Sequence, residues 1–145
     1  MQTSKTIDQK RAQHALEKIR KMIPCDRDQP KEKEQKEKLG DEYASYVTQL
    51  PANMITNGMG QALAQLVAAA KGSKEDAHYL LYENLQNWLC EKYPYSSKYK
   101  GKSDLLDAII QGDQQDYRWA FHEAMSWLEW HKKLATAYLK KTDRK

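Results

Sequence analysis

The chain has 145 residues, a length that fits one domain and allows about two thirds of the unfolded chain's surface to be buried. It is 30% charged, with a net charge of +4 and a pI near 8.9. Two valines and one phenylalanine are too few for a β-sheet core. No apolar run reaches the roughly 20 residues of a membrane span, and the N-terminal segment lacks the apolar centre of a signal peptide. We therefore expect a hydrophilic, all-α, cytoplasmic protein.

The first predicted helix covers residues 7–23 and ends at Pro24, because its apolar residues recur every three or four positions. The Lys/Glu run over 31–38 has nothing to bury and predicts an exposed helix or a mobile segment without chemistry. The side of the first helix opposite its apolar residues is interpreted either as a solvated face or as a stripe that faces a polyanion. This side carries Arg11, His14, Lys18 and Lys21.

Two helices are predicted around Pro51, the first over 42–49 and the second over 52–71. The second contains Asn57-Gly58, a strong hairpin signal, but no alternating strands flank it, so the helical interpretation is favoured. A glycine inside a helix costs about 1 kcal/mol relative to alanine. We therefore expect Gly58 and Gly60 to lie where a side chain would obstruct a neighbouring helix or a partner.

Three helices are predicted in the second half of the chain. Ser73 with Asp76 resembles a capping box for the first of them. Ser103 is expected to cap the short helix "DLLDAIIQ", and Asp113 with Asp116, another capping pair, opens a last helix over about 114–140. The predicted fold is all-α: one compact, bundle-like domain over 1–145, with about six helices and a long C-terminal helix.

The last helix is apolar over most of its girth, so several neighbours or another protein must cover it. Trp119 and Trp130 lie nearly opposite the centre of its main apolar stripe. One of them is expected in the core and the other in a subunit contact. The remaining polar wedge is basic and includes Arg118, Lys133 and Lys140.

The linking loop over 93–103 places tyrosines beside Lys98, Lys100 and Lys102. Such tyrosines can stack on RNA bases, or they can pack against the body of the protein while the lysines stay in solvent. A net charge of +4 is too small for tight independent RNA binding at physiological salt. The charge pattern therefore favours weak, additive contacts within a larger assembly.

No catalytic, cofactor or metal site is expected. The chain has no His-x-x-x-His pair, phosphate-binding loop or nucleophile elbow, and Cys25 and Cys90 are expected to be free thiols. Glu75-x-x-His78 matches half of a di-iron motif, which a helical bundle needs twice. The second half is missing from the sequence.

Two stretches carry a family resemblance: "TNGMGQALAQL" at 56–66 and "YRWAFHEAMSWLEWHKKLATAYL" at 117–139. With "RAQHALEKIRKM" and "EYASYVTQLP" before them, they resemble the small α-helical subunit of the Cmr complex, the type III-B CRISPR effector. The likeness covers about residues 10 to 140. The Lys/Glu run and the linking loop depart from the family pattern.

The resemblance implies a subunit without enzymatic activity that serves in antiviral defence. Copies of such a subunit stack as a filament along the complex and help to form the channel for the duplex of guide RNA and target RNA. The implied partners are other Cmr subunits, further copies of this chain and both RNAs, with no membrane. Two other classes stay open: a helical adaptor that binds only protein, and a small enzyme with one acid-base pair.

The family has no short RNA-contact motif, so candidate positions follow from charge and surface. The resemblance suggests a basic face on the last helix and close packing at the two glycines. The predicted RNA-facing residues are Arg118, Lys132, Lys133, Lys140, Lys98, Lys100, Lys102, Arg11, Lys18 and Lys21. The predicted subunit-packing residues are Gly58, Gly60, Trp119 and Trp130.

Overall fold

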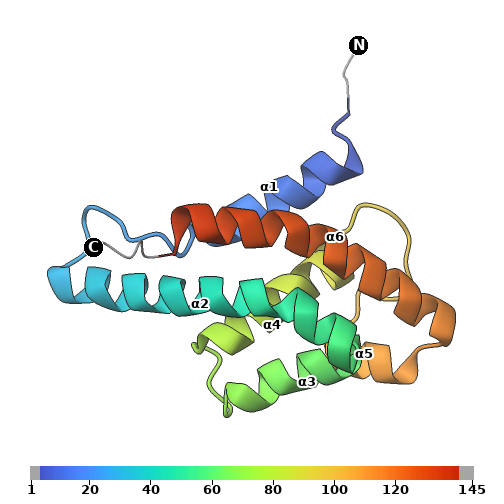
Figure 1. The fold of residues 1–145 in the computed structure, drawn as a ribbon. Coiled ribbons are helices and arrows are strands. Elements are labelled where there is room, and N and C mark those ends of the chain that lie inside the picture. Colours follow the sequence, from blue (N-terminus) through green and yellow to red (C-terminus); the bar gives the residue numbers. More distant parts are fainter. Residues whose placement is uncertain (1–3, 141–145) are drawn as a thin grey trace.

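The computed structural model describes residues 4–140, which fold into six α-helices and one π-helix and contain no strand. The predicted all-α fold with a long C-terminal helix is confirmed. The longest helices, α2 and α6, run side by side, with α1 against α6 and the shorter helices on the other side of α2 (Figure 1). The elements are α1 Ile7–Arg20, α2 Pro30–Asn57, α3 Met59–Ala69, α4 Ala77–Gln86, the π-helix η1 Asn87–Lys92, α5 Leu105–Gln111 and α6 Gln114–Tyr138.

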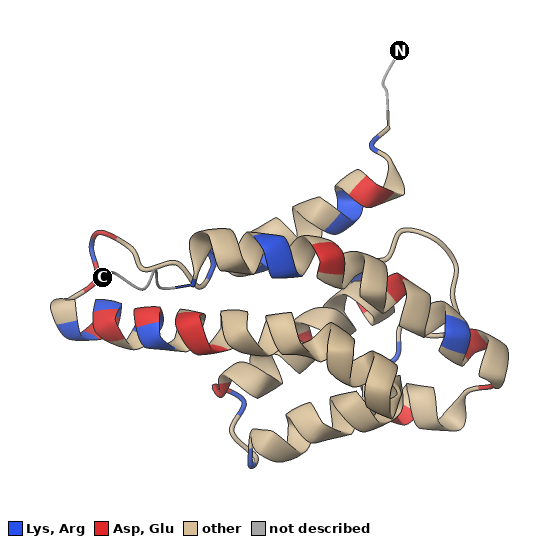
Figure 2. Cartoon of the chain, viewed as in Figure 1, with Lys and Arg blue, Asp and Glu red and all other residues tan. Residues whose placement is uncertain are grey.

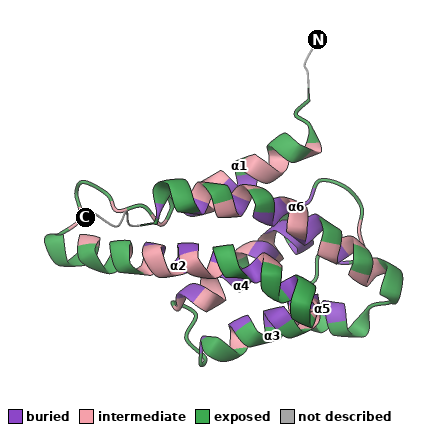
Figure 3. Ribbon diagram, viewed as in Figure 1, coloured by how far each residue is buried: buried purple, intermediate pink, exposed green. Residues whose placement is uncertain are grey.

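The core lies around one face of α6, where small and large side chains alternate. Ala120, Ala124 and Ala135 are fully buried there and let neighbouring helices approach, while Trp127 fills the space between them. Trp88 comes from η1 and is 2% exposed. Buried residues follow the inner sides of the helices, and exposed residues follow their outer sides (Figure 3).

One continuous helix, α2, replaces the charged segment and the separate helix that the sequence predicts before Pro51. The Lys/Glu run over 31–38 forms its exposed first turns, where opposite charges alternate (Figure 2). The predicted break at Pro51 is wrong. An interior proline costs about 3 kcal/mol, but Leu50 and Met54 on either side of it are each 1% exposed. Burial of this shared apolar face holds the helix together across the proline.

Gly58 divides the region that the sequence predicts as one helix over 52–71. Its φ of +87° ends α2, and α3 begins at the next residue. Its N–H donates to the carbonyl of Met54 and its carbonyl accepts from the N–H of Ala62, both at 3.0 Å, so one glycine joins the two helices. The single helix over 52–71 is therefore a wrong prediction, because the backbone at Gly58 is one that only glycine adopts readily.

Gly60 has a different role from the one predicted for it within the fold. A Cβ at this position would meet no atom closer than 3.9 Å, so close packing inside the chain does not require the glycine. Its N–H donates to the hydroxyl of Tyr117 at 3.1 Å, which satisfies one of the free amides at the start of α3.

We therefore expect alanine substitutions at the two glycines to change folding stability in opposite directions. Gly58→Ala should destabilise the fold by about 2 kcal/mol, because alanine is strained at this φ and ψ. Gly60→Ala, the matched control, should be neutral or stabilising by up to about 1 kcal/mol, because it replaces glycine inside a helix without a clash. Urea unfolding of both variants measures the difference. Equal destabilisation by the two substitutions would contradict this explanation.

Helix caps match the prediction at one of three positions. Asp113 caps α6 by accepting from the N–H of Asp116, as predicted. At α4 the cap is Asp76, not Ser73, and its side chain accepts from the N–H of His78. At α5 the helix begins one residue later than Ser103 predicts, because the side chain of Gln86 accepts from the first helical N–H. Tertiary contacts thus supply the cap at α5.

Cys25 is exposed and Cys90 is buried, and both are free thiols, as predicted. Burial raises the pKa of Cys90 to about 11. In the described part of the chain, no helix is long and apolar enough to cross a membrane.

Candidate functional site

The basic residues of α6 differ in how far they are neutralised. Arg118 is exposed and, within residues 4–140, forms no ion pair. Lys132 and Lys133 lie 3.8 Å and 3.7 Å from the carboxylate of Glu129. The ammonium of Lys140 donates to the hydroxyl of Ser45 at 2.7 Å, beyond the end of the helix. Of these four cations, Arg118 is therefore the one without an acidic side chain within 4 Å among the described residues, since Lys140 also lies 3.6 Å from Asp41.

The linking loop splits its lysines and tyrosines into two groups. The ammonium of Lys100 donates to the carbonyl of Tyr93 at 2.8 Å and so fixes the loop to the end of η1. Lys98 and Lys102 are exposed. Tyr93 is 9% exposed, so it packs against the body of the protein. Tyr99 does the same at 2% exposed, whereas Tyr95 remains half exposed.

The side of α1 that the sequence predicts to face solvent or a polyanion is partly covered by α6. Its first two residues, Arg11 and His14, point towards α6. Arg11 is bound to Glu123 of α6, and His14 is buried at 5% exposure. Interpreting His14 as part of an outer face is therefore wrong, because α6 covers this side of the helix. Lys18 is half buried, which lowers its pKa, and Lys21 is exposed.

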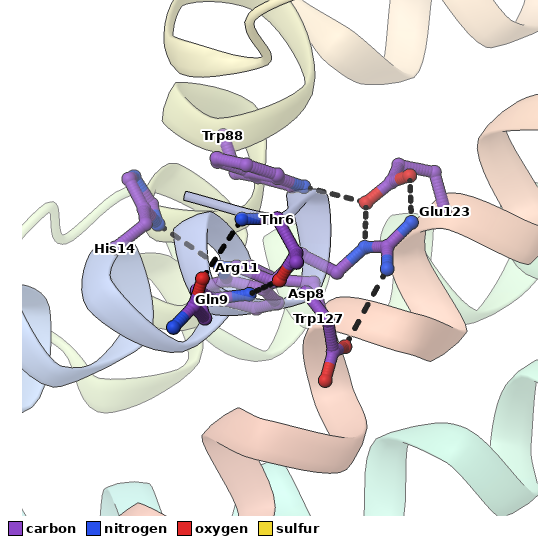
Figure 4. A network of polar contacts seen from close by, with 8 residues as sticks. All are labelled: Thr6, Asp8, Gln9, Arg11, His14, Trp88, Glu123 and Trp127. Atoms are coloured by element: carbon purple, nitrogen blue, oxygen red, sulfur yellow. Dashed lines mark hydrogen bonds and ion pairs between the residues drawn. The ribbon is translucent and has the colours of Figure 1, made fainter. Parts of the chain in front are cut away.

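An ion pair between a partly buried guanidinium and a buried carboxylate connects α1 to α6. The guanidinium of Arg11 donates from Nε and from a terminal nitrogen to the two carboxylate oxygens of Glu123, at 2.7 Å and 2.8 Å. The indole of Trp88 donates to the same carboxylate at 3.0 Å (Figure 4). Glu123 is only 4% exposed, so these three donors replace its hydration.

Two buried histidines flank Trp127, and their hydrogen bonds fix them as neutral rings. The indole of Trp127 can only donate, so Nδ1 of His14 accepts from it at 2.9 Å (Figure 4), and Nε2 of His14 carries the proton donated to Asn87. His131 stacks on Trp127 at 4.1 Å between ring centroids. Burial lowers the pKa of His14 to about 4 and that of His131 to about 3.

His131 is held by a second chain of hydrogen bonds. Asn84 donates to the hydroxyl of Tyr43 at 2.8 Å, which leaves that hydroxyl free to donate to Nε2 of His131 at 2.5 Å. The proton of the neutral ring then lies on Nδ1, which has no partner among the described residues. Nε2 is occupied as a hydrogen-bond acceptor, so these hydrogen bonds favour the neutral form of the His131 ring.

Sequence reasoning missed Glu123 and His131, although one signal could have found them. Each lies four residues from Trp127, on the same side of the helix, so helical spacing places both on its buried face. An apolar count omits them because they are polar. Their hydrogen-bond partners lie on other helices, so what they bind could be known only from the fold.

The two predicted subunit-packing tryptophans occupy different environments. The ring of Trp119 packs against Tyr93 at 4.9 Å and lies nearly parallel to Tyr99 at 5.9 Å, so it belongs to the rim of the core. Trp130 is also partly buried, but it is not packed against the core cluster, and it lines a hollow of about 290 Å³ together with Asp8, Glu129 and Lys133.

His78, from the predicted half of a metal motif, contacts a residue nearby in the chain and an aromatic ring of α2 instead. Its ring lies 2.7 Å from the carboxylate of Asp76 and stacks on Tyr46 at 3.7 Å. Within residues 4–140, no three histidine, cysteine or acidic side chains are grouped to hold a metal ion.

Comparison with known proteins identifies the family. A family model described as CRISPR-associated protein (Cas_Cmr5) matches residues 7–138, from the start of α1 to the end of α6. The fold is also similar to the X-ray crystal structure of a CRISPR-associated Cmr5 family protein from Thermus thermophilus. That likeness has a TM-score of 0.68 and 24% sequence identity, and covers 94% of this chain and 100% of the other. The chain therefore belongs to the Cmr5 family of CRISPR-associated proteins, the small subunits of the type III-B Cmr complex.

Proposed function

We propose that this chain is a non-catalytic, structural subunit of a type III-B CRISPR ribonucleoprotein in the cytoplasm. It stacks along the complex with further copies of itself and helps to hold the duplex of guide RNA and target RNA in antiviral defence. The family match over residues 7–138 carries this proposal. The buried titratable groups support it, because His14, His131 and Glu123 are hydrogen-bonded within the core.

The RNA-facing part of the proposal concerns exposed cations. Arg118, Lys98 and Lys102 have no ion pair within the described residues, so their charge is available to phosphate groups. Arg11, Lys100 and Lys140 are engaged inside the protein and contribute less to an outer surface. We therefore base the proposed RNA contact on the other cations of the predicted set.

Removal of the basic face on α6 tests this part. The triple variant R118Q/K132Q/K133Q should still co-purify with the other Cmr subunits but retain less RNA, with a salt dependence reduced by about 2 in logarithmic slope for single-stranded RNA. The matched control, K31Q/K33Q/K38Q on the exposed start of α2, removes the same charge elsewhere. Equal RNA retention by wild type, variant and control would favour an adaptor without RNA contact.

We assign the subunit-packing role to Trp130 rather than to Trp119, because Trp130 lines a hollow outside the core cluster and Trp119 packs on the core. Trp130→Ala should leave the chain folded, as judged by circular dichroism, and lower its co-purification with Cmr subunits. Ile110→Ala, which removes an exposed apolar side chain that does not line this hollow, serves as the comparison. Unchanged co-purification of the Trp130 variant would contradict the assignment.

A further inference from the structure

A cleft opens between the linking loop and the first turns of α6. The loop curves past this end of the helix (Figure 1). The cleft has a volume of about 490 Å³, which is large enough for a nucleotide. Its lining combines an indole, two hydroxyls, an amide and both signs of charge. The residues are Ser96, Ser97, Lys98, Gln115, Asp116 and Trp119.

A second hollow of about 280 Å³ shares Lys98 and Asp116 with the cleft, so the two form one continuous lined surface. It adds Lys102 at its edge and Tyr99 at its wall. Its other carboxylate belongs to Asp107. Two lysines, two carboxylates and a phenol therefore surround a space beside an indole.

The hydroxyl of Tyr99 is the observation that points to a ligand. Tyr99 is 2% exposed, and its hydroxyl has no hydrogen-bond partner among the described residues. A buried polar group normally has a partner, since leaving it without one is costly. Gly112 lies directly beside the hydroxyl, because a Cβ there would be 3.5 Å from it, and both residues line the second hollow. Burial raises the pKa of Tyr99 to about 12, so the phenol stays protonated and can donate a hydrogen bond.

The side chains that line the cleft and the second hollow indicate which class of ligand fits there. An indole offers a stacking surface for a nucleobase, and two ammonium groups with a phenol donor suit a phosphate. The carboxylates of Asp107 and Asp116 oppose a bare phosphate but accept hydrogen bonds from sugar hydroxyls. A ribonucleotide unites these features, since its 2′-hydroxyl can donate to a carboxylate and a deoxyribonucleotide has none.

We propose that this cleft binds one ribonucleotide of a single-stranded RNA segment, which rests on the proposed RNA-facing function. The base lies against Trp119, and the ribose 2′-hydroxyl donates to the carboxylate of Asp116. The phosphate lies between Lys98 and Lys102, within reach of the Tyr99 hydroxyl.

Binding of fluorescein-labelled ten-nucleotide oligoadenylates, as RNA and as DNA, to the full purified chain tests the proposal by fluorescence anisotropy at low salt. Tyr99→Phe is the sharpest variant, because it removes only an unpartnered hydroxyl. Its melting temperature should stay the same or rise, and its RNA affinity should fall about fivefold. A wild-type RNA affinity for this folded variant would overturn the proposal.

Asp116→Ala tests the sugar contact, because alanine has no side-chain acceptor for the 2′-hydroxyl. The wild-type chain should prefer RNA to DNA, and the variant should lose that preference because its RNA affinity falls towards its DNA affinity. Equal wild-type affinity for the two oligonucleotides would overturn this contact and the proposal with it. The variant K98Q/K102Q should bind both more weakly, whereas K31Q/K38Q, which removes two exposed lysines of α2, is the control for charge alone.

The outcomes separate this proposal from the broader function. If R118Q/K132Q/K133Q loses RNA while Tyr99→Phe and Asp116→Ala do not, the chain contacts RNA elsewhere and the cleft assignment fails. If the cleft variants lose co-purified Cmr subunits at unchanged RNA affinity, the cleft receives a protein side chain, and the proposal is again overturned.

Discussion

Acidification from pH 7 to pH 5 is expected to destabilise the folded chain by about 4 kcal/mol, with His14 and His131 each contributing about 2 kcal/mol. Burial lowers both folded-state pKa values, to about 4 and about 3, whereas an unfolded histidine titrates near pH 6.5. Below pH 6.5 the unfolded chain therefore binds protons that the folded chain rejects. Stability should be constant above this pH and fall steadily as the pH drops towards 4.

Urea unfolding between pH 8 and pH 5 measures this effect. His14→Gln should halve the pH dependence, because one of the two histidines is gone. His122→Gln is the matched control, since His122 lies on the same helix as His131 but is exposed, and it should leave the dependence unchanged. A wild-type chain whose stability is the same at pH 7 and pH 5 would show that these rings are not held neutral.

Glu123→Ala is expected to cost about 3 kcal/mol of folding stability, because it removes one partner of a buried ion pair. The substitution leaves the guanidinium of Arg11 and the indole N–H of Trp88 without their shared acceptor. It also opens space between α6 and η1. The expected loss is therefore larger than that of an ordinary surface carboxylate.

Glu129→Ala is the matched control on the same helix, because Glu129 is exposed and its two lysine contacts are long. It should change stability by less than about 0.5 kcal/mol. Arg11→Met, which removes the other partner, should also be strongly destabilising because it leaves the buried carboxyl group of Glu123 without its charged donor. Similar small effects for Glu123→Ala and Glu129→Ala would mean that the ion pair adds no net stability.

These two groups of buried contacts fix the surface on which the proposed function depends. The Arg11–Glu123 pair and the bond between His14 and Trp127 tie α1 to α6, and α6 carries Arg118 and one wall of the nucleotide cleft. Loss of either contact should therefore change RNA affinity only indirectly, because it alters how α6 packs against α1. The binding assays above use variants that leave these contacts in place.

Local patterns predicted the parts of the fold that depend on neighbouring residues. The all-α class followed from composition, and the start of α6 followed from Asp113, whose side chain reaches an amide three residues away. The exposed start of α2 followed from a charge run with nothing to bury. None of these features requires knowledge of another helix.

Long-range packing reversed three local predictions. Pro51 should end a helix, yet buried residues on both of its sides hold α2 together. Ser103 should cap α5, yet Gln86 takes that role from another helix. His14 shares a side of α1 with Arg11, Lys18 and Lys21 by its spacing, yet it lies in the core because α6 covers it.

The amino-acid sequence by itself determined the helical class, the positions where charge accumulates and the family to which the chain belongs. Only the tertiary structure decided which polar groups are buried and which surface residues meet, as at Glu123 and in the cleft that joins Lys98 to Trp119. The physical reason is that helical spacing shows which residues share one side of a helix. What covers that side depends on contacts between segments that are distant in the chain.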